Sequence, residues 1–304
     1  MKTINKFLFA LIAVSLFAFT SCEKEDDNMV PKEKTIAETA ASDPNFSTLV
    51  AALTKADLVG TLNGAGSYTV FAPTNAAFQA LFADLKVSGL NDLSAEALKP
   101  ILLYHVLGAK KSASMIETGY YSSLSPAQGS YVSMLISKGS SVKINNKAMV
   151  TTADLNASNG VIHVIDKVLL PPNVVDIAIN NTDFSTLVEA VVKANLVTTL
   201  SGTGPFTVFA PTNTAFSALF TDLKVTGITD LSAAALSPIL TYHVVSGNVL
   251  SSTLKAGTVP TVNGKNITIA LGMPPTINTN SQIVAVDVQG TNGVVHVISK
   301  VLLP

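Results

Sequence analysis

The sequence contains one cysteine, Cys22, in 304 residues. An intramolecular disulfide is therefore excluded, and so is a zinc site built from several cysteine ligands. Charged residues are scarce as well, at 13% of the chain, and the formal net charge is −1. A chain without a basic excess has no electrostatic footprint for nucleic acid, so no nucleic-acid partner is expected.

Motifs for catalysis or cofactor binding are missing too. The sequence has no HExxH pair and no GxSxG nucleophile elbow. Gly64-Ala65-Gly66 and its counterpart Gly202-Thr203-Gly204 are too short to cradle a phosphate and are interpreted as turns. Since no acid, base and nucleophile recur together, we expect no catalytic residue, no cofactor and no metal, and we do not predict an enzyme.

The amino terminus carries an apolar run, Phe7 to Phe19, that is too short to span a bilayer as a helix. It follows a basic start, and this pattern predicts a signal peptide over residues 1–21. Phe19-Thr20-Ser21-Cys22 resembles the lipobox of bacterial lipoproteins, with phenylalanine in place of the usual aliphatic residue. The resemblance implies that Cys22 is acylated, and two or more acyl chains anchor a protein stably. The alternative is ordinary cleavage that leaves a spare cysteine.

Charge is concentrated directly behind Cys22. Of the 39 acidic and basic residues, eight lie between Glu23 and Lys34. Such a segment cannot bury enough apolar area to offset its ordering entropy, so residues 22–34 are predicted to be the lipidated cysteine and a flexible linker. The acidic run also resembles the export tag that directs some lipoproteins to the outer face of the outer membrane, although a solvated linker has the same composition. We expect an outer-membrane lipoprotein exposed on the cell surface.

A tandem duplication occupies the rest of the chain. Phe46 to Leu107 reappears without a gap as Phe184 to Val245, with 43 of 62 positions identical. After a variable middle, Asn159 to Pro171 returns as Asn292 to Pro304. A unit of about 130 residues has the size of a self-contained domain and is too long for a solenoid repeat. The sequence therefore predicts two similar globular domains in series.

Three motifs present in both copies resemble the fasciclin-like domain family. They are TVFAPTNAAF and TVFAPTNTAF at 69–78 and 207–216, the Tyr-His pairs at 104–105 and 242–243, and the closing NGVIHVID and NGVVHVIS. The resemblance covers nearly all of the chain from about residue 35 onward. It implies an α+β fold, with fasciclin-like domains at 35–171 and 173–304, each a β-sheet wedge with several packed helices. It also implies an extracellular adhesion or matrix module without catalysis.

Hydrophobic periodicity places the elements of one repeat. Apolar residues between Phe46 and Leu53 recur at helical spacing, and residues 68–72 are typical of a buried strand. Pro100 is predicted to disturb or end a later helix. From about Tyr131 the period changes to two, which predicts strands, the last of them over Val161 to Leu169.

The polar residues of the shared motifs are interpreted as structural. A histidine among apolar neighbours is more often a buried structural residue than a ligand or base. Short polar side chains after a proline suit a helix cap better than a ligand contact. The Tyr-His pair matches a motif associated with integrin binding in animal members of the family, and we expect it to serve only the fold here. The residues concerned are Thr74, Asn75, Tyr104, His105, His163, Thr212, Asn213, Tyr242, His243 and His296.

The segment between Val106 and Asn159 differs between the copies. Its tyrosines and the Lys110-Lys111 pair occur in the first copy, whereas the second has Lys255, Pro260 and Met273-Pro274-Pro275 in the corresponding stretch. Exposed tyrosines beside lysines can stack on sugar rings and bond through their hydroxyls. We expect this segment to contact a polysaccharide or an envelope or surface protein; the alternative is that the tyrosines fill the edge of the wedge. The candidate partner-binding residues are Tyr120, Tyr121, Tyr131, Lys110 and Lys111.

Two functions are consistent with these patterns. The first is a non-enzymatic cell-surface adhesion or matrix-binding module that is anchored as a lipoprotein. The alternative is a carrier of a small apolar ligand, such as a lipid or pigment, in a pocket between sheet and helices. An apolar pocket of a few hundred cubic ångströms would favour the carrier, because ligand sites are on the order of 300 Å³ or larger.

Overall fold

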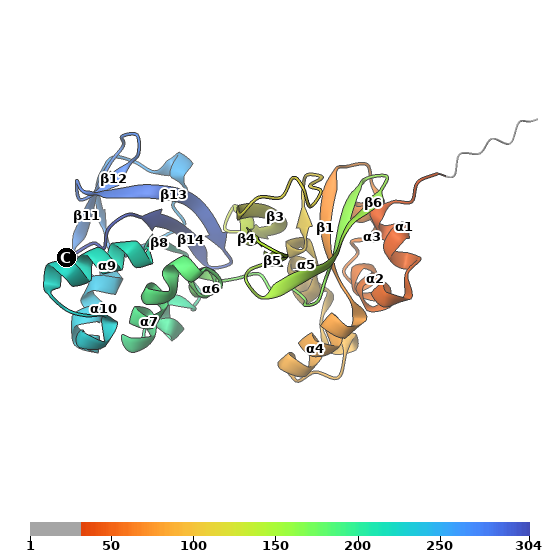
Figure 1. Cartoon of the computed structure of the whole chain (residues 1–304), viewed down its shortest axis with the longest axis horizontal. Helices are drawn as coiled ribbons and strands as arrows, with labels where there is room; N and C mark the ends of the chain where they lie inside the picture. Colours follow the sequence, from red (N-terminus) through yellow and green to blue (C-terminus); the bar gives the residue numbers. More distant parts are fainter. Residues whose placement is uncertain (1–31) are drawn as a thin grey trace, which may run out of the picture. The chain divides into compact units, whose positions relative to one another are not determined.

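The computed structural model describes residues 32–304 (Figure 1). The predicted signal peptide, Cys22 and most of the charged linker lie outside the described residues. Residues 33–304 form one compact unit that contains both copies of the repeat.

The first domain mixes helices with strands. Its helices are α1 (Ile36–Ala41), α2 (Ser47–Lys55), α3 (Val59–Asn63), α4 (Asn75–Leu85) and α5 (Ala95–Tyr104), with short 3-10 helices at Pro44–Phe46 and Leu90–Asp92. Its strands are β1 (Tyr68–Pro73), β2 (Val106–Leu107), β3 (Gly119–Ala127), β4 (Ser130–Lys138), β5 (Val142–Ile144), β6 (Ala148–Ala157) and β7 (Gly160–Ile165).

The second domain repeats this order. Its helices are α6 (Val174–Asn180), α7 (Ser185–Lys193), α8 (Val197–Leu200), α9 (Asn213–Leu223) and α10 (Ala233–Tyr242), with 3-10 helices at Thr182–Phe184, Ile228–Asp230 and Ser251–Thr253. Its strands are β8 (Phe206–Pro211), β9 (Val244–Ser246), β10 (Gly257–Pro260), β11 (Asn266–Ala270), β12 (Thr276–Ile277), β13 (Ser281–Gly290) and β14 (Gly293–Ile298). The expected α+β fold with two tandem domains is confirmed.

The two sheets share a parallel strand pair but differ in closure. β1 pairs in parallel with β7, as β8 does with β14. In the first domain β2 meets β3 at Leu107 and Ser123, and this contact closes the seven strands into a barrel. In the second domain β10 has four residues where β3 has nine, and the seven-stranded sheet stays open between β9 and β10.

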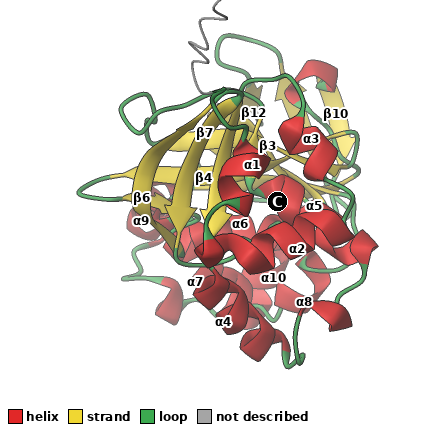
Figure 2. Cartoon of the chain, turned by 90° about the vertical axis from the view of Figure 1, so that its right-hand side faces the viewer, coloured by secondary structure: helices red, strands yellow, loops and turns green. Residues whose placement is uncertain are grey.

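Each domain buries apolar side chains in two clusters. In the first domain, one cluster lies between the helices and the sheet, around Phe46, Leu98 and Ile162. The other fills the barrel, around Phe71 and Met134. The second domain has the same two clusters. Figure 2 shows most of the helices below the strands in this view.

Threonine side chains begin the long helix of each domain, as the sequence predicts. Thr74 Oγ1 accepts the N–H of Ala77 over 3.3 Å, and Thr212 Oγ1 accepts the N–H of Ala215 over 3.4 Å. Each hydroxyl satisfies one of the backbone donors that a helix leaves unpaired in its first turn.

One expectation for a single element is wrong, and one is narrowed. Helix α5 continues through Pro100 to Tyr104, so the proline does not end it; the carbonyl that Pro100 leaves without a donor belongs to Glu96 in the exposed first turn. The last strand of the first domain ends at Ile165 and does not reach Leu169. Asp166 turns the chain there, where its Oδ1 accepts the N–H of Met149 over 2.7 Å.

The two domains are in contact through strands of both. β13 packs against β3 and β4, while the chain passes from β7 to α6 through Pro171 and Pro172. Polar bonds cross the boundary: Asn146 Nδ2 donates to the carbonyl of Asn180 over 2.7 Å. The contact therefore combines packing of strands with hydrogen bonds.

Candidate functional site

The Tyr-His pairs of the two repeats are buried. The Tyr104 hydroxyl donates to the carbonyl of Ser133 and accepts from Asn145 Nδ2, each over 2.9 Å, and its side chain is wholly inaccessible. Tyr242 makes the equivalent two bonds in the second domain. Burial raises the pKa of Tyr104 above its ordinary value, so the phenol stays protonated. A partner cannot touch either tyrosine without opening the domain.

The neighbouring histidines are neutral cross-links inside each domain. His105 Nε2 accepts the N–H of Leu169 over 2.9 Å, which leaves Nδ1 as the protonated nitrogen that donates to the Ile101 carbonyl over 2.8 Å. His243 repeats both bonds. Burial lowers the pKa of each of these histidines to about 4. With both nitrogens bonded and no access to solvent, neither histidine suits a base or a metal ligand.

The second histidine pair holds a bulge between the last two strands. His163 Nδ1 accepts the N–H of Asp154 over 3.2 Å, and Nε2 donates to the Lys111 carbonyl over 2.9 Å. Asp154 has a left-handed backbone, with φ of 61°. His296 and Asp287 repeat the arrangement, and burial lowers the pKa of His296. The histidine thus fixes a strained turn of the sheet to the segment that follows β2.

Asn75 and Asn213 join two helices. Asn75 Oδ1 accepts the N–H of Thr48 over 2.9 Å. Its Nδ2 donates to the Pro44 carbonyl over 2.9 Å and to Ser47 Oγ over 3.0 Å. Asn213 makes the same three bonds in the second domain. This side chain links the start of α4 to the start of α2, which is a structural task.

Within residues 32–304 no three histidine, cysteine, aspartate or glutamate side chains are grouped so as to hold a metal ion. In that same stretch, none of the helices combines the length and the apolar character needed to cross a bilayer.

Three of the five candidate partner-binding residues line one groove on the first domain. Lys111, Tyr121 and Tyr131 contribute to its walls, and its volume is about 300 Å³. Tyr121 is fixed by Glu117, since its hydroxyl accepts the Glu117 N–H and donates to the Glu117 carbonyl, both over 2.9 Å. Tyr131 lies on β4 with 51% of its surface exposed. The groove therefore combines a fixed tyrosine, an exposed tyrosine and a lysine.

Tyr120 and Lys110 lie apart from this groove. Successive side chains of a strand point to opposite faces, so Tyr120 points away from Tyr121. The Tyr120 hydroxyl accepts from Asn181 Nδ2 over 3.0 Å, and its ring packs against the apolar core of the second domain. Burial raises the pKa of Tyr120. The candidate set is thus divided: three residues line the groove, Tyr120 lies at the contact between domains, and Lys110 is exposed and belongs to neither.

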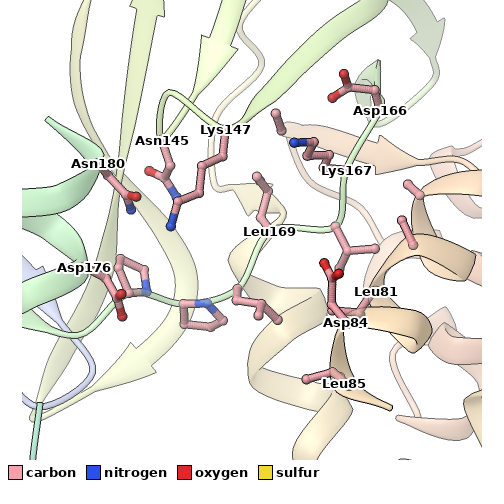
Figure 3. A pocket seen from close by; sticks show the side chains of 17 residues that line it. Leu81, Asp84, Leu85, Asn145, Lys147, Asp166, Lys167, Leu169, Asp176 and Asn180 are labelled. Carbon is pink, nitrogen blue, oxygen red and sulfur yellow. The ribbon is translucent and has the colours of Figure 1, made fainter. Parts of the chain in front are cut away.

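A larger cleft, which the sequence patterns do not predict, lies where the two domains meet (Figure 3). Its volume is about 410 Å³. The lining comes from α4, from the turn between β5 and β6, from the connection after β7 and from α6. Only the fold brings these segments together, and none of them carries a recognised ligand motif.

Comparison with known proteins identifies the family of both domains. A sequence model of the fasciclin domain matches residues 44–171 and again residues 182–304. The chain belongs to the fasciclin domain family. The Tyr-His pairs and the capping threonines just described lie within the matched segments.

Relatives come from bacteria and animals. Protein sll1483 of Synechocystis sp. is 49% identical over 138 residues, which are 45% of this chain and 74% of that protein. Transforming growth factor-beta-induced protein ig-h3 of Sus scrofa is 31% identical over 247 residues, which are 80% of this chain and 35% of that protein. Among solved structures, a FAS1 domain pair from the insect cell adhesion molecule fasciclin I aligns with a TM-score of 0.48 and 19% identity, covering 84% of this chain and 92% of that one.

Proposed function

We propose that this protein is a non-enzymatic adhesion module that binds a polysaccharide or a surface protein through the groove of its first domain. Fasciclin domains occur in cell adhesion proteins, which supports adhesion as the broad function. The observation that carries the finer proposal is the groove formed by Lys111, Tyr121 and Tyr131.

The chemistry of the groove suits a sugar chain. A tyrosine ring offers an apolar face on which a sugar ring can stack, and its hydroxyl adds a hydrogen bond. Tyr121 is held rigidly by Glu117, so little side-chain entropy is lost when a ligand packs on it. The ammonium group of Lys111 would favour sugars that carry carboxylate or sulfate groups.

A glycan array and a pull-down from envelope fractions, both with the full chain, test this function. Tyr131→Ala and Lys111→Ala should each weaken binding about tenfold, because each removes one contact of the groove. Lys110→Ala is the matched control, since Lys110 is the adjacent lysine but does not line the groove. Equal binding by all three variants and the unchanged chain would rule the groove out.

The anchoring part of the proposal rests on the sequence. The chain would be secreted, acylated on Cys22 and held at the outer membrane by its acyl chains, with residues 23–34 as the linker. A tethered position on the cell surface is where an adhesion module has to act.

The carrier alternative receives less support. An apolar cavity in the second domain, lined by residues such as Val175, Leu187 and Val208, has a volume of about 50 Å³. Ligand pockets are on the order of 300 Å³ or larger, so this cavity is too small for a lipid or pigment. The cleft of about 410 Å³ between the domains is large enough, but charged side chains line it.

A further inference from the structure

The loop between β11 and β12 exposes apolar side chains to solvent. Leu271 has 57% of its surface exposed, and Met273 is fully exposed. Pro274 and Pro275 follow, and each proline narrows the conformations that are open to the loop. Apolar side chains stabilise a domain only when folding removes them from water. Leu271 and Met273 therefore contribute little to holding the second domain together.

Exposed valines on β13 extend this surface. The Ile283 N–H donates to the Pro275 carbonyl over 2.8 Å, which places this part of β13 beside the loop. Ile283 is buried in the core, whereas Val284 and Val286 have 56% and 43% of their surfaces exposed. Single exposed apolar residues are common, but a contiguous patch of them marks a binding surface. The apolar tip, as this patch is called below, consists of Leu271, Met273, Val284 and Val286.

The first domain has polar or smaller residues at the same places. Its loop 138–142 joins β4 to β5 in the same register in which loop 271–275 joins β11 to β12. Because the two loops have the same length, the turn itself does not require leucine or methionine. The residues of the first domain that correspond to the apolar tip are Lys138, Ser140, Thr151 and Ala153. The apolar tip is therefore a property of the second domain alone.

The strands around the apolar tip carry little negative charge. Residues 231–304 include three lysines and a single acidic residue, Asp287. Its carboxylate is already bonded, since Oδ1 accepts the Ser251 N–H over 2.7 Å and Oδ2 accepts the Ser251 hydroxyl. Lys255 is exposed and lies just before β10, the strand that pairs with β11. An anionic surface thus meets little repulsion from these strands and one lysine that attracts it.

A lipid bilayer fits these properties better than a protein partner does. Four apolar side chains cover much less than the roughly 800 Å² that each partner of a stable protein complex buries. Met273 is fully exposed, so the apolar tip protrudes and would need a matching pocket in a protein. Lipid chains are fluid and close around a protruding side chain without such a pocket. Acidic headgroups also attract lysines that lie near the membrane surface.

We propose that the apolar tip inserts into a lipid bilayer that contains acidic lipids. Leu271 and Met273 enter the apolar layer, the two valines lie at its boundary, and Lys255 meets the phosphate groups of the lipids. This contact is separate from the acyl chains expected on Cys22 and from the groove of the first domain. It gives the second domain a binding surface of its own.

Sedimentation of residues 23–304 with lipid vesicles tests the contact. This protein contains the whole compact unit and lacks both Cys22 and the apolar run before it. With vesicles of phosphatidylcholine and phosphatidylglycerol at about 3:1, half of the protein should sediment at about 1 mM lipid, because two apolar side chains leave water. Leu271→Ser with Met273→Ser should lower binding at least about tenfold. Met115→Ser with Val192→Ser removes two other exposed apolar side chains and is the control, which should bind like the unchanged protein.

A fluorescent label reports whether the loop itself enters the bilayer. Residues 23–304 contain no cysteine, so Met273→Cys and Ser140→Cys each provide a single site for labelling. Ser140 has the same position in the loop of the first domain as Met273 has in the second, which makes it the matched control. An environment-sensitive dye at position 273 should shift its emission to shorter wavelength when vesicles are added. The same dye at position 140 should show no shift.

Several results would overturn the proposal. One is the absence of sedimentation at about 10 mM lipid, ten times the expected midpoint. Another is equal binding by the unchanged protein and the Leu271→Ser, Met273→Ser variant, which would leave charge as the only attraction. Equal emission shifts at the two label positions would contradict insertion through the apolar tip. Capture of an envelope protein that depends on Leu271 and Met273, without vesicle binding, would assign the tip to a protein partner. No sugar takes part in these experiments, so they leave the test of the tyrosine groove independent.

Discussion

Gln289 donates its backbone N–H to Ser133 Oγ over 2.9 Å, and the two residues, which belong to different domains, are 1% and 6% exposed. A hydrogen bond this deeply buried couples the domains, since separating them leaves both partners to be resolvated. The Tyr104 hydroxyl binds the carbonyl of the same serine, so the bond lies directly above the barrel core of the first domain.

Replacing Ser133 should weaken the contact between the domains. We expect Ser133→Ala to lower the free energy of unfolding by about 1–3 kcal/mol, because the Gln289 N–H then lacks its buried acceptor. Calorimetry should also show a broader or divided transition as the domains unfold less cooperatively. Ser140→Ala, at an exposed serine on the same domain, is the control. A Ser133→Ala protein as stable as this control would mean that the bond contributes nothing.

Acid should destabilise the protein through His105 and His243. Their folded-state pKa is about 4, below the ordinary 6.5, so the unfolded chain binds protons that the folded chain refuses. Stability is therefore complete above about pH 6.5 and falls as the pH drops towards 4, by up to about 3 kcal/mol for each histidine. Urea unfolding measured between pH 7 and pH 4.5 checks this.

A variant isolates this effect from the protonation of carboxylates. His105→Gln with His243→Gln has no imidazole at these positions, so its stability should fall less steeply between pH 6.5 and 4.5 than that of the unchanged chain. Parallel pH profiles for the two proteins would show that the histidines are not the groups concerned.

Asn75 and Asn213 should contribute equally to their domains. Asn75→Ala removes three hydrogen bonds between α4 and the start of α2 and should lower the free energy of unfolding by about 2 kcal/mol. Asn213→Ala should cost the same amount in the second domain. Gln79→Ala, on the exposed face of α4, is the control and should change stability by less than about 0.5 kcal/mol. Chemical unfolding of the three variants measures the differences.

Cys22 should hold the protein on the membrane. Cys22→Ser should shift the chain from the detergent-extracted membrane fraction to the soluble fraction, while the circular dichroism of the folded domains stays unchanged. Protease added to whole cells should remove the unchanged protein if it is displayed outside. Full membrane retention of Cys22→Ser would refute lipid anchoring, and full protection from protease would refute surface display alone.

The sequence predicts those parts of the fold that depend on local chemistry or on repetition. The duplication places two domains, and the position of Thr74 after a proline predicts a helix cap that the structure contains. The sequence leaves open whether Pro100 ends α5 or only disturbs its first turn, because the cost of the proline depends on which carbonyl loses its donor. Here that carbonyl is exposed, and the helix continues.

Features that depend on packing between distant segments are not predictable in this way. Tyr120 and Tyr121 are adjacent and look alike in the sequence, yet one contacts the second domain and the other lines a surface groove. Asn180 follows an ordinary apolar helix pattern, and its unpaired oxygen becomes apparent only when α6 lies against the first domain. The hydrophobic period of a segment indicates which face of the helix or strand is buried, but not which other segment packs against that face.

The difference in closure between the two sheets affects how the chain reaches its native state. Tandem domains with nearly the same sequence are prone to exchange segments while folding, because an element of one copy fits the other. Here β3 and β4 have nine residues each, whereas β10 and β11 have four and five. If β10 entered the first domain in place of β3, much of the edge of β4 would stay unpaired, and the swapped barrel could not close. Unequal strand length thus makes strand exchange between the copies unfavourable, while their parallel strands remain almost identical.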